Sequence, residues 1–129
     1  MTLEDVKDWV KTFMGAEGSI SVGSIDASKS KCIGVYQNKR YSDTLPTPIG
    51  GECMRSYGQR HVVLLVHWGE NPVECERKAA ELYAQLQARP RSEIGGKSSI
   101  VGVAEPIGVG KDEKGICEYV VELLITYNK

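Results

Sequence analysis

The chain has 129 residues, 41% of them hydrophobic and 26% charged, and its 16 basic and 17 acidic side chains leave a formal net charge of -1. This length suits one domain with its own core, so we expect residues 1–129 to form a single domain. A nearly neutral chain lacks the positive electrostatic field that attracts nucleic acid. No apolar run approaches the ~18 residues that span a bilayer, and the acidic start lacks the basic residues of a secretory signal. We therefore expect no specific nucleic-acid binding and no membrane association.

The first predicted element is an amphipathic helix over residues 3–14. Its apolar residues recur at the spacing of one helical stripe, at Val6, Trp9, Val10, Phe13 and Met14. Thr2 and Asp5 have the spacing of a capping box, and Gly15 is placed to end the helix. We expect Trp9 to be buried.

Two short runs follow, SISVGSI and KCIGVYQN, with apolar residues at alternate positions and a polar turn between them. This pattern predicts a β-hairpin.

The segment from Asn38 to Gly58 is polar and irregular and contains two prolines. A connection of about 20 residues without regular structure is more often a functional or partner-ordered loop than a passive link. Within it, Arg40, Tyr41 and Leu45 suit contact with a partner better than exposure to water. We expect this loop to be part of a binding surface.

The strongest predicted strand is RHVVLLVHW, residues 60–68. Because strand residues alternate between faces, one face carries Val62, Leu64, Val66 and Trp68. The opposite face carries His61, Val63, Leu65 and His67. A helix over residues 72–88 follows, with Asn71 as its cap and Pro72 at its first position. We expect Leu82, on its apolar stripe, to be buried.

The remaining segments, SIVGVAEPI, GVGKDEKG and ICEYVVELLITY, predict two strands joined by a glycine-rich loop. The elements together predict an α+β fold, a mainly antiparallel sheet of about five strands with the two helices packed on one face. The other sheet face is apolar too, at Val63, Leu65, Val120 and Leu124. Exposed apolar patches of this kind usually mark partner surfaces, so we expect an oligomer.

Two strings resemble part of a phosphate-binding loop, Gly96-Lys97-Ser98 and Gly108-Val109-Gly110-Lys111. The complete signature needs a glycine where this chain has Arg91, and a helix where this chain has a predicted strand. Both strings therefore predict turns, with Gly95-Gly96 letting the chain leave the second helix at positive φ. We expect no nucleotide binding.

No cysteine or histidine pattern predicts a catalytic or metal site. The four cysteines show no close pair of metal-ligand spacing and favour reduced thiols in a reducing cytoplasm, at Cys32, Cys53, Cys75 and Cys117. A Cys/His nucleophile pair stays open as an alternative without support from spacing. His61 and His67, roughly 20 Å apart on one strand, cannot share a metal ion, and we expect each near the surface. We expect no enzyme activity, no cofactor and no metal.

Several strings, in their order along nearly the whole chain, resemble minor capsid or tail-terminator-like proteins of phages and prophages of Gram-positive bacteria. They are Tyr36-Gln37 with Lys39-Arg40, Ile49-Gly50-Gly51, Ser56-Tyr57, Leu65-Val66-His67-Trp68, ECERKAAELYAQL and EPIGVGKDEKGICEYVVELLITY. None of these strings is a catalytic signature, so the resemblance implies a structural role.

The resemblance implies a virion protein, assembled in the host cytoplasm, that forms a hexameric ring at the head-proximal end of the tail. Such a ring would stop tail-tube polymerisation and contact tail-tube and head–tail connector proteins. We expect the interface to combine the loop and sheet residues with the glycine-rich loop, at Arg40, Tyr41, Leu45, Val63, Leu65, Lys111, Asp112, Val120 and Leu124. The alternative is a cytoplasmic small-molecule-binding or regulatory domain with a pocket under residues 38–58.

Overall fold

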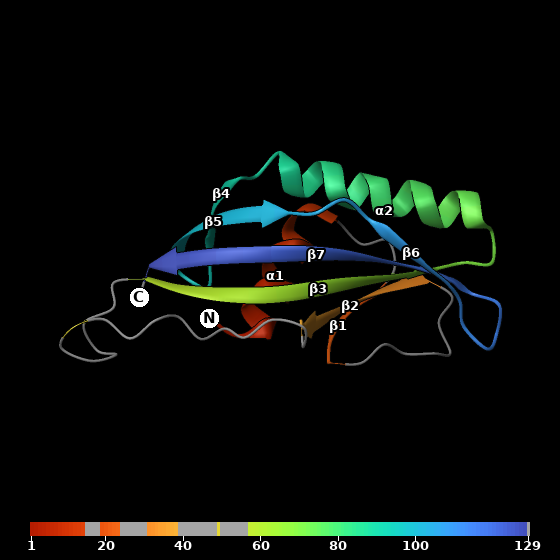
Figure 1. The fold of residues 1–129 in the computed structure, drawn as a ribbon, viewed down its shortest axis with the longest axis horizontal. Helices are drawn as coiled ribbons and strands as arrows, with labels where there is room; N and C mark the ends of the chain where they lie inside the picture. Colours follow the sequence, from red (N-terminus) through yellow and green to blue (C-terminus); the bar gives the residue numbers. More distant parts are fainter. Residues whose placement is uncertain (15–18, 24–30, 39–48, 50–56, 129) are drawn as a thin grey trace.

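A computed structural model describes residues 1–14, 19–23, 31–38, 49 and 57–128 (Figure 1). The described chain forms two helices and seven strands. In chain order they are α1 (Leu3–Met14), β1 (Ser19–Val22), β2 (Lys31–Gln37), β3 (Tyr57–Trp68), α2 (Pro72–Gln87), β4 (Arg91–Ile94), β5 (Lys97–Val103), β6 (Ile107–Lys111) and β7 (Cys117–Asn128).

The strands form one mixed sheet in the order β1-β2-β3-β7-β5-β4, and β6 also pairs with β7. The two longest strands, β3 and β7, lie side by side at its centre and pair antiparallel, with Leu64 opposite Val121. Strands β5 and β6 pair with successive parts of β7, so β7 has a described neighbour on both sides along most of its length. The predicted α+β class is confirmed, and the sheet is larger than the five strands expected.

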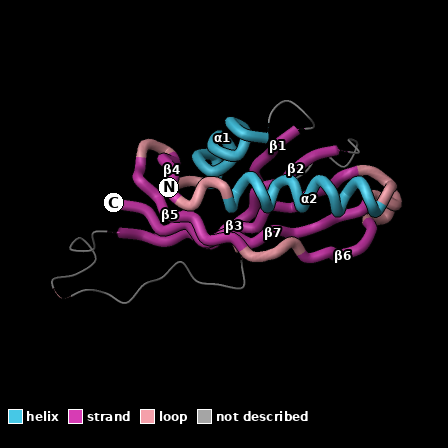
Figure 2. The backbone as a smooth tube through the Cα atoms, turned by 90° about the horizontal axis from the view of Figure 1, so that it is seen from above, coloured by secondary structure: helices cyan, strands magenta, loops and turns pink. Residues whose placement is uncertain are grey.

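Both helices pack on the same face of the sheet. In Figure 1, α2 runs above the strands and α1 lies behind them, and in Figure 2 α2 crosses in front of the strands with α1 beside it. At the start of α1, the backbone N–H of Asp5 donates to the Thr2 hydroxyl, and the Thr2 N–H donates to the Asp5 carboxylate. The Asn71 side chain caps α2 by accepting from the N–H of Val73. These local contacts satisfy backbone donors that a helix start leaves without partners.

The core lies between the helices and this sheet face. It joins Val6 and Val10 of α1 with Leu82 and Leu86 of α2 and with alternate residues of β2, β3, β5 and β7. Trp9 is 8% exposed and Leu82 is fully buried, which confirms both predictions of burial.

The predicted hairpin of the first two strands is wrong, because β1 pairs with β2 in parallel, with Ser19 opposite Cys32 and Val22 opposite Val35. Alternation of apolar residues identifies a strand without specifying its direction. Only residues 23–30 separate the two strands, fewer than the dozen or more that usually connect parallel neighbours, so the length of the connection also favoured the hairpin that the structure does not have.

Two predicted turns also differ from the structure. Gly95 and Gly96 adopt positive φ as expected, at 59° and 76°, but they join β4 to β5, while α2 has already ended at Gln87. Residues Ile107–Lys111 form strand β6, with an irregularity in its pairing between Gly108 and Gly110, and the turn comes after them. In both cases a short strand of weak apolar character was missed.

Candidate assembly surface

The sheet face opposite the helices carries the apolar residues that sequence analysis assigned to a partner surface. Val63 and Leu65 of β3 and Val120 and Leu124 of β7 are half-buried, whereas the alternate residues of both strands are buried in the core. Cross-strand pairing sets Leu65 opposite Val120. Because successive strand residues point to opposite faces, this pairing brings the predicted residues onto one surface.

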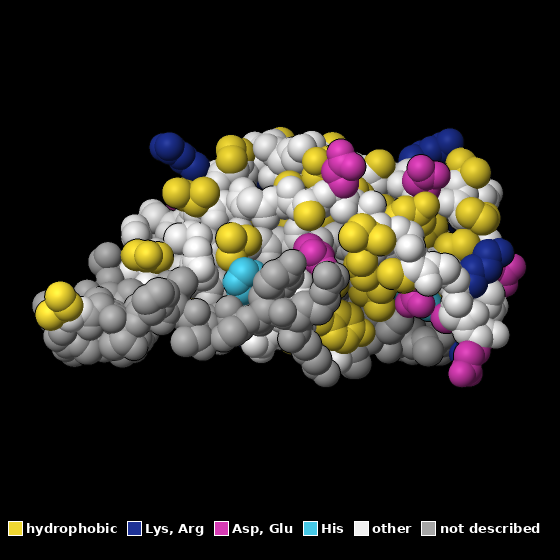
Figure 3. All heavy atoms as spheres, viewed as in Figure 1, with side chains coloured by type: hydrophobic (Ala, Val, Ile, Leu, Met, Phe, Trp, Pro, Cys, Tyr) yellow, Lys and Arg dark blue, Asp and Glu magenta, His cyan; other side chains and the backbone are white. Residues whose placement is uncertain are grey.

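Strand β6 extends this surface at one side. Ile107 lies opposite Val120 and is 51% exposed. Figure 3 views this face and shows hydrophobic side chains gathered over β7 and β6. Leu65, Val120 and Ile107 therefore form a continuous apolar strip across three neighbouring strands, which we call the open-face strip.

A hollow of about 440 Å³ lies farther along the same face. Leu124 lines it together with His61 and Glu122. Gly102 of β5 also lines the hollow and, as a glycine, places no side chain in it. His61 is half-buried. The hollow has an apolar wall and polar groups at its edge, which is the composition of a protein contact surface.

His67 does not lie near the surface, so the prediction for it is wrong. Its side chain is fully buried, with Nδ1 3.2 Å from Glu118 Oε2 and Nε2 3.7 Å from Asp112 Oδ2. The turn after β6 folds back onto the end of β3, where the Cys117 N–H donates to the carbonyl of Gly69. This fold-back, which depends on the long-range β3–β7 pairing, encloses the histidine.

Asp112, predicted to be part of the interface, has a structural role in the turn. Its carboxylate accepts hydrogen bonds from the backbone N–H groups of Lys114 and Ile116. The hydrogen bond from Ile116 is the largest cause that lowers the pKa of Asp112, and the nearby His67 also lowers it. Lys111, the residue before it, is exposed at the end of β6.

The other predicted interface residues, Arg40, Tyr41 and Leu45, lie outside the described residues. So does most of the predicted loop from Asn38 to Gly58, although its last two residues belong to β3. The pocket expected beneath residues 38–58 falls outside the described part of the chain as well.

The described cysteines are buried in the fold rather than placed at a reactive site. Cys75 donates to the carbonyl of Cys117 at 3.2 Å, and Cys117 donates to the carbonyl of Glu70 at 3.7 Å. Burial raises the pKa of the Cys75 thiol to about 11, so Cys75 is protonated at neutral pH, the opposite of an activated nucleophile. In the described residues, no group of three or more His, Cys, Asp or Glu could hold a metal ion.

Comparison with known proteins decides the family. The sequence model of the family described as bacteriophage tail terminator protein matches residues 11–129. The chain belongs to the bacteriophage tail terminator family. This membership confirms the resemblance found in the sequence strings and assigns a structural role in the phage tail. Neither described helix is long and apolar enough to cross a bilayer.

The other comparisons add little to the family assignment. A search of curated proteins gives no match. A solved structure with 15% sequence identity covers 97% of this chain and 87% of its own length at a TM-score of 0.45. A likeness at that level carries no argument about function.

Proposed function

We propose that this tail terminator assembles into a hexameric ring at the head-proximal end of the tail, where it stops tube polymerisation and joins the tail to the head. The observation that carries the proposal is the match to the tail terminator family over residues 11–129. The open-face strip supports it, because an apolar surface that the described helices leave uncovered suits burial against another protein.

A ring needs two different surfaces on each subunit, because each copy contacts its two neighbours in a head-to-tail manner. The open-face strip is one candidate surface. Burial of its aliphatic side chains would supply binding free energy, and a formal net charge of -1 opposes self-association little. That the protein is not an enzyme stays a prediction, in agreement with the structural role of the family.

The direct test is to polymerise the tail-tube protein of the same phage with and without the purified terminator. We expect tubes of limited length with a ring at one end by electron microscopy, and a discrete oligomer mass by light scattering at high concentration. Leu65→Asp, which introduces a charge on the open-face strip, is expected to abolish both effects. A monomeric protein that leaves tube length unchanged would contradict the proposal and favour the alternative of a small-molecule-binding domain.

A further inference from the structure

A groove of about 190 Å³ lies between helix α2 and the connection from β5 to β6. It is separate from the open-face hollow and is lined by Glu76, Ala80, Tyr83, Glu105, Pro106 and Tyr119. Ala80 and Pro106 give it apolar walls, and the two tyrosines place aromatic rings beside the two carboxylates.

The lining of the groove suits a basic side chain. Glu76 and Glu105 are exposed, and neither forms an ion pair with a basic side chain in the described ranges. Burial raises the pKa of Tyr119, and the negative charge of Glu76 adds to the effect, so this phenol stays neutral. Neutral aromatic rings next to carboxylates attract an ammonium group, while its alkyl stem packs on apolar walls.

The surroundings of the groove indicate a protein partner. Val73, one helical turn before Glu76, is 58% exposed, and Val109 of β6 is 55% exposed. Large aliphatic side chains on both sides of a small groove make a contact area much wider than one bound metabolite. Such a combination of apolar rim and central charged groove fits an anchoring side chain carried by a protein surface.

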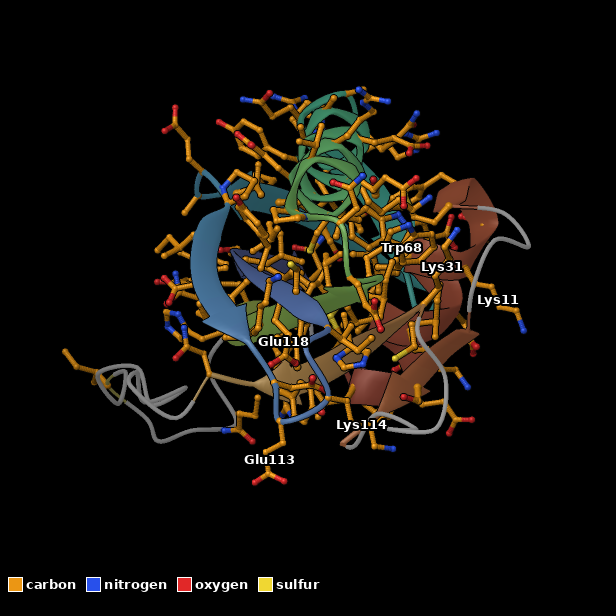
Figure 4. The ribbon with its side chains drawn as sticks, turned by 90° about the vertical axis from the view of Figure 1, so that its right-hand side faces the viewer. Lys11, Lys31, Trp68, Glu113, Lys114 and Glu118 are labelled. Carbon is orange, nitrogen blue, oxygen red and sulfur yellow. The ribbon has the colours of Figure 1, made fainter. Side chains whose placement is uncertain are left out.

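The opposite side of the same subunit offers a matching surface. Figures 2 and 4 place β6 and α1 on opposite sides of the molecule, with α2 and the sheet between them. Lys11, in the last turn of α1, is exposed and has no ion-pair partner in the described ranges. Figure 4 shows Lys11 pointing outward on the side that also carries Lys31, whose ammonium lies 5.7 Å from the Trp68 ring centre.

We infer that the groove between α2 and β6 of one copy takes the Lys11 side chain of the next copy in the ring. The inference rests on the proposed function and adds the residues that meet at the subunit boundary. It follows from charge complementarity between the groove and Lys11, and from their positions on opposite sides, which a head-to-tail contact requires.

A charge exchange tests this contact. Glu105→Lys and Lys11→Glu each place like charges at the boundary. Each variant alone is expected to raise the protein concentration needed for ring assembly about 10-fold. Mixed in equal amounts, the two variants restore opposite charges at every boundary of an alternating ring, so assembly should return to the wild-type level. Glu113→Lys is the matched control, since Glu113 carries the same charge at the turn after β6 and points into solvent (Figure 4).

Assembly is read by light scattering and native mass spectrometry, after circular dichroism has shown equal melting temperatures. Rescue in the mixture, with the Glu113→Lys control unaffected, would support the contact. Single variants that assemble like wild type, or a mixture no better than either variant alone, would overturn it while leaving the proposed ring intact. A wild-type protein that forms no ring, alone or on tail tubes, would overturn both proposals.

Discussion

Leu64 and Leu65 are neighbours on β3 whose side chains point to opposite faces of the sheet, which makes them a matched pair for separating folding from assembly. Leu64 is fully buried in the core, and Leu65 is half-buried on the open-face strip. The same substitution, leucine to alanine, removes the same atoms from each face. We expect the first to affect the free energy of unfolding and the second to affect subunit association.

The magnitudes follow from burial. Leu64→Ala removes side-chain carbons worth about 0.8 kcal/mol for each buried methylene and leaves a closed cavity, so it should lower the free energy of unfolding by about 2–5 kcal/mol. Leu65 borders solvent in the described subunit, so Leu65→Ala leaves no closed cavity and should cost about 1 kcal/mol. At each subunit boundary, Leu65→Ala should remove about 1 kcal/mol of association free energy, which raises the dissociation constant roughly 5-fold.

The assay is urea unfolding of dilute monomer, paired with light scattering of concentrated protein on tail tubes. Leu64→Ala should shift the unfolding midpoint and leave the association of folded protein unchanged. If instead Leu65→Ala destabilises the monomer as much as Leu64→Ala does and leaves assembly intact, the open-face strip belongs to the core of the monomer. That result would refute its assignment as a partner surface.

Three further predictions concern pH, thiols and nucleotides. Hydrogen bonds lower the folded pKa of Asp112, so its stabilising effect should be present above the unfolded pKa of ~3.9 and lost as pH falls through the folded value. As the pH is lowered from 6 to 2, the melting temperature should therefore fall less steeply in Asp112→Asn than in the wild-type protein. Buried Cys75 and Cys117 should resist a thiol reagent at pH 8 in native protein, and all four thiols should react in urea; fewer than four would indicate a disulfide. Calorimetry with ATP or GTP and magnesium should give no heat above dilution, and Lys97→Ala should assemble like wild type, because Lys97 begins strand β5 rather than a helix.

Sequence alone predicted the parts of this fold that local periodicity determines. The stripe in α1, the Asn71 cap of α2 and the alternation in β3 each depend on residues close together in the chain. From alternation in β3 and β7, the sequence also predicted that a second sheet face is apolar. These features required no knowledge of which strands pair.

The errors all concern features set by pairing at long range. His67 looked like a strand-end histidine, and only the fold-back of the turn after β6 encloses it with Glu118. Strand β4 is short, and three of its four residues are polar, so it is recognisable only through its pairing with β5 around Gly95 and Gly96. The groove at Glu76 and Glu105 joins a helix to a distant connection, so no local pattern could indicate it.

The contrast between the two faces of the central strands bears on how subunits could associate in order rather than aggregate. The core face is fully buried at positions such as Leu64 and Val121, so we expect most of the monomer's stability to come from this face rather than from the open-face strip. Leu65 and Val120 of the strip are half-buried, Ile107 is exposed, and none of the three is aromatic, so the strip is a modest patch that weakly promotes random aggregation. A groove with unpaired carboxylates adds orientation to this weak attraction, because only a subunit that brings a basic side chain to the correct position satisfies both surfaces. In the proposed ring, weak apolar burial combined with one oriented charge contact would favour a closed assembly over disordered association.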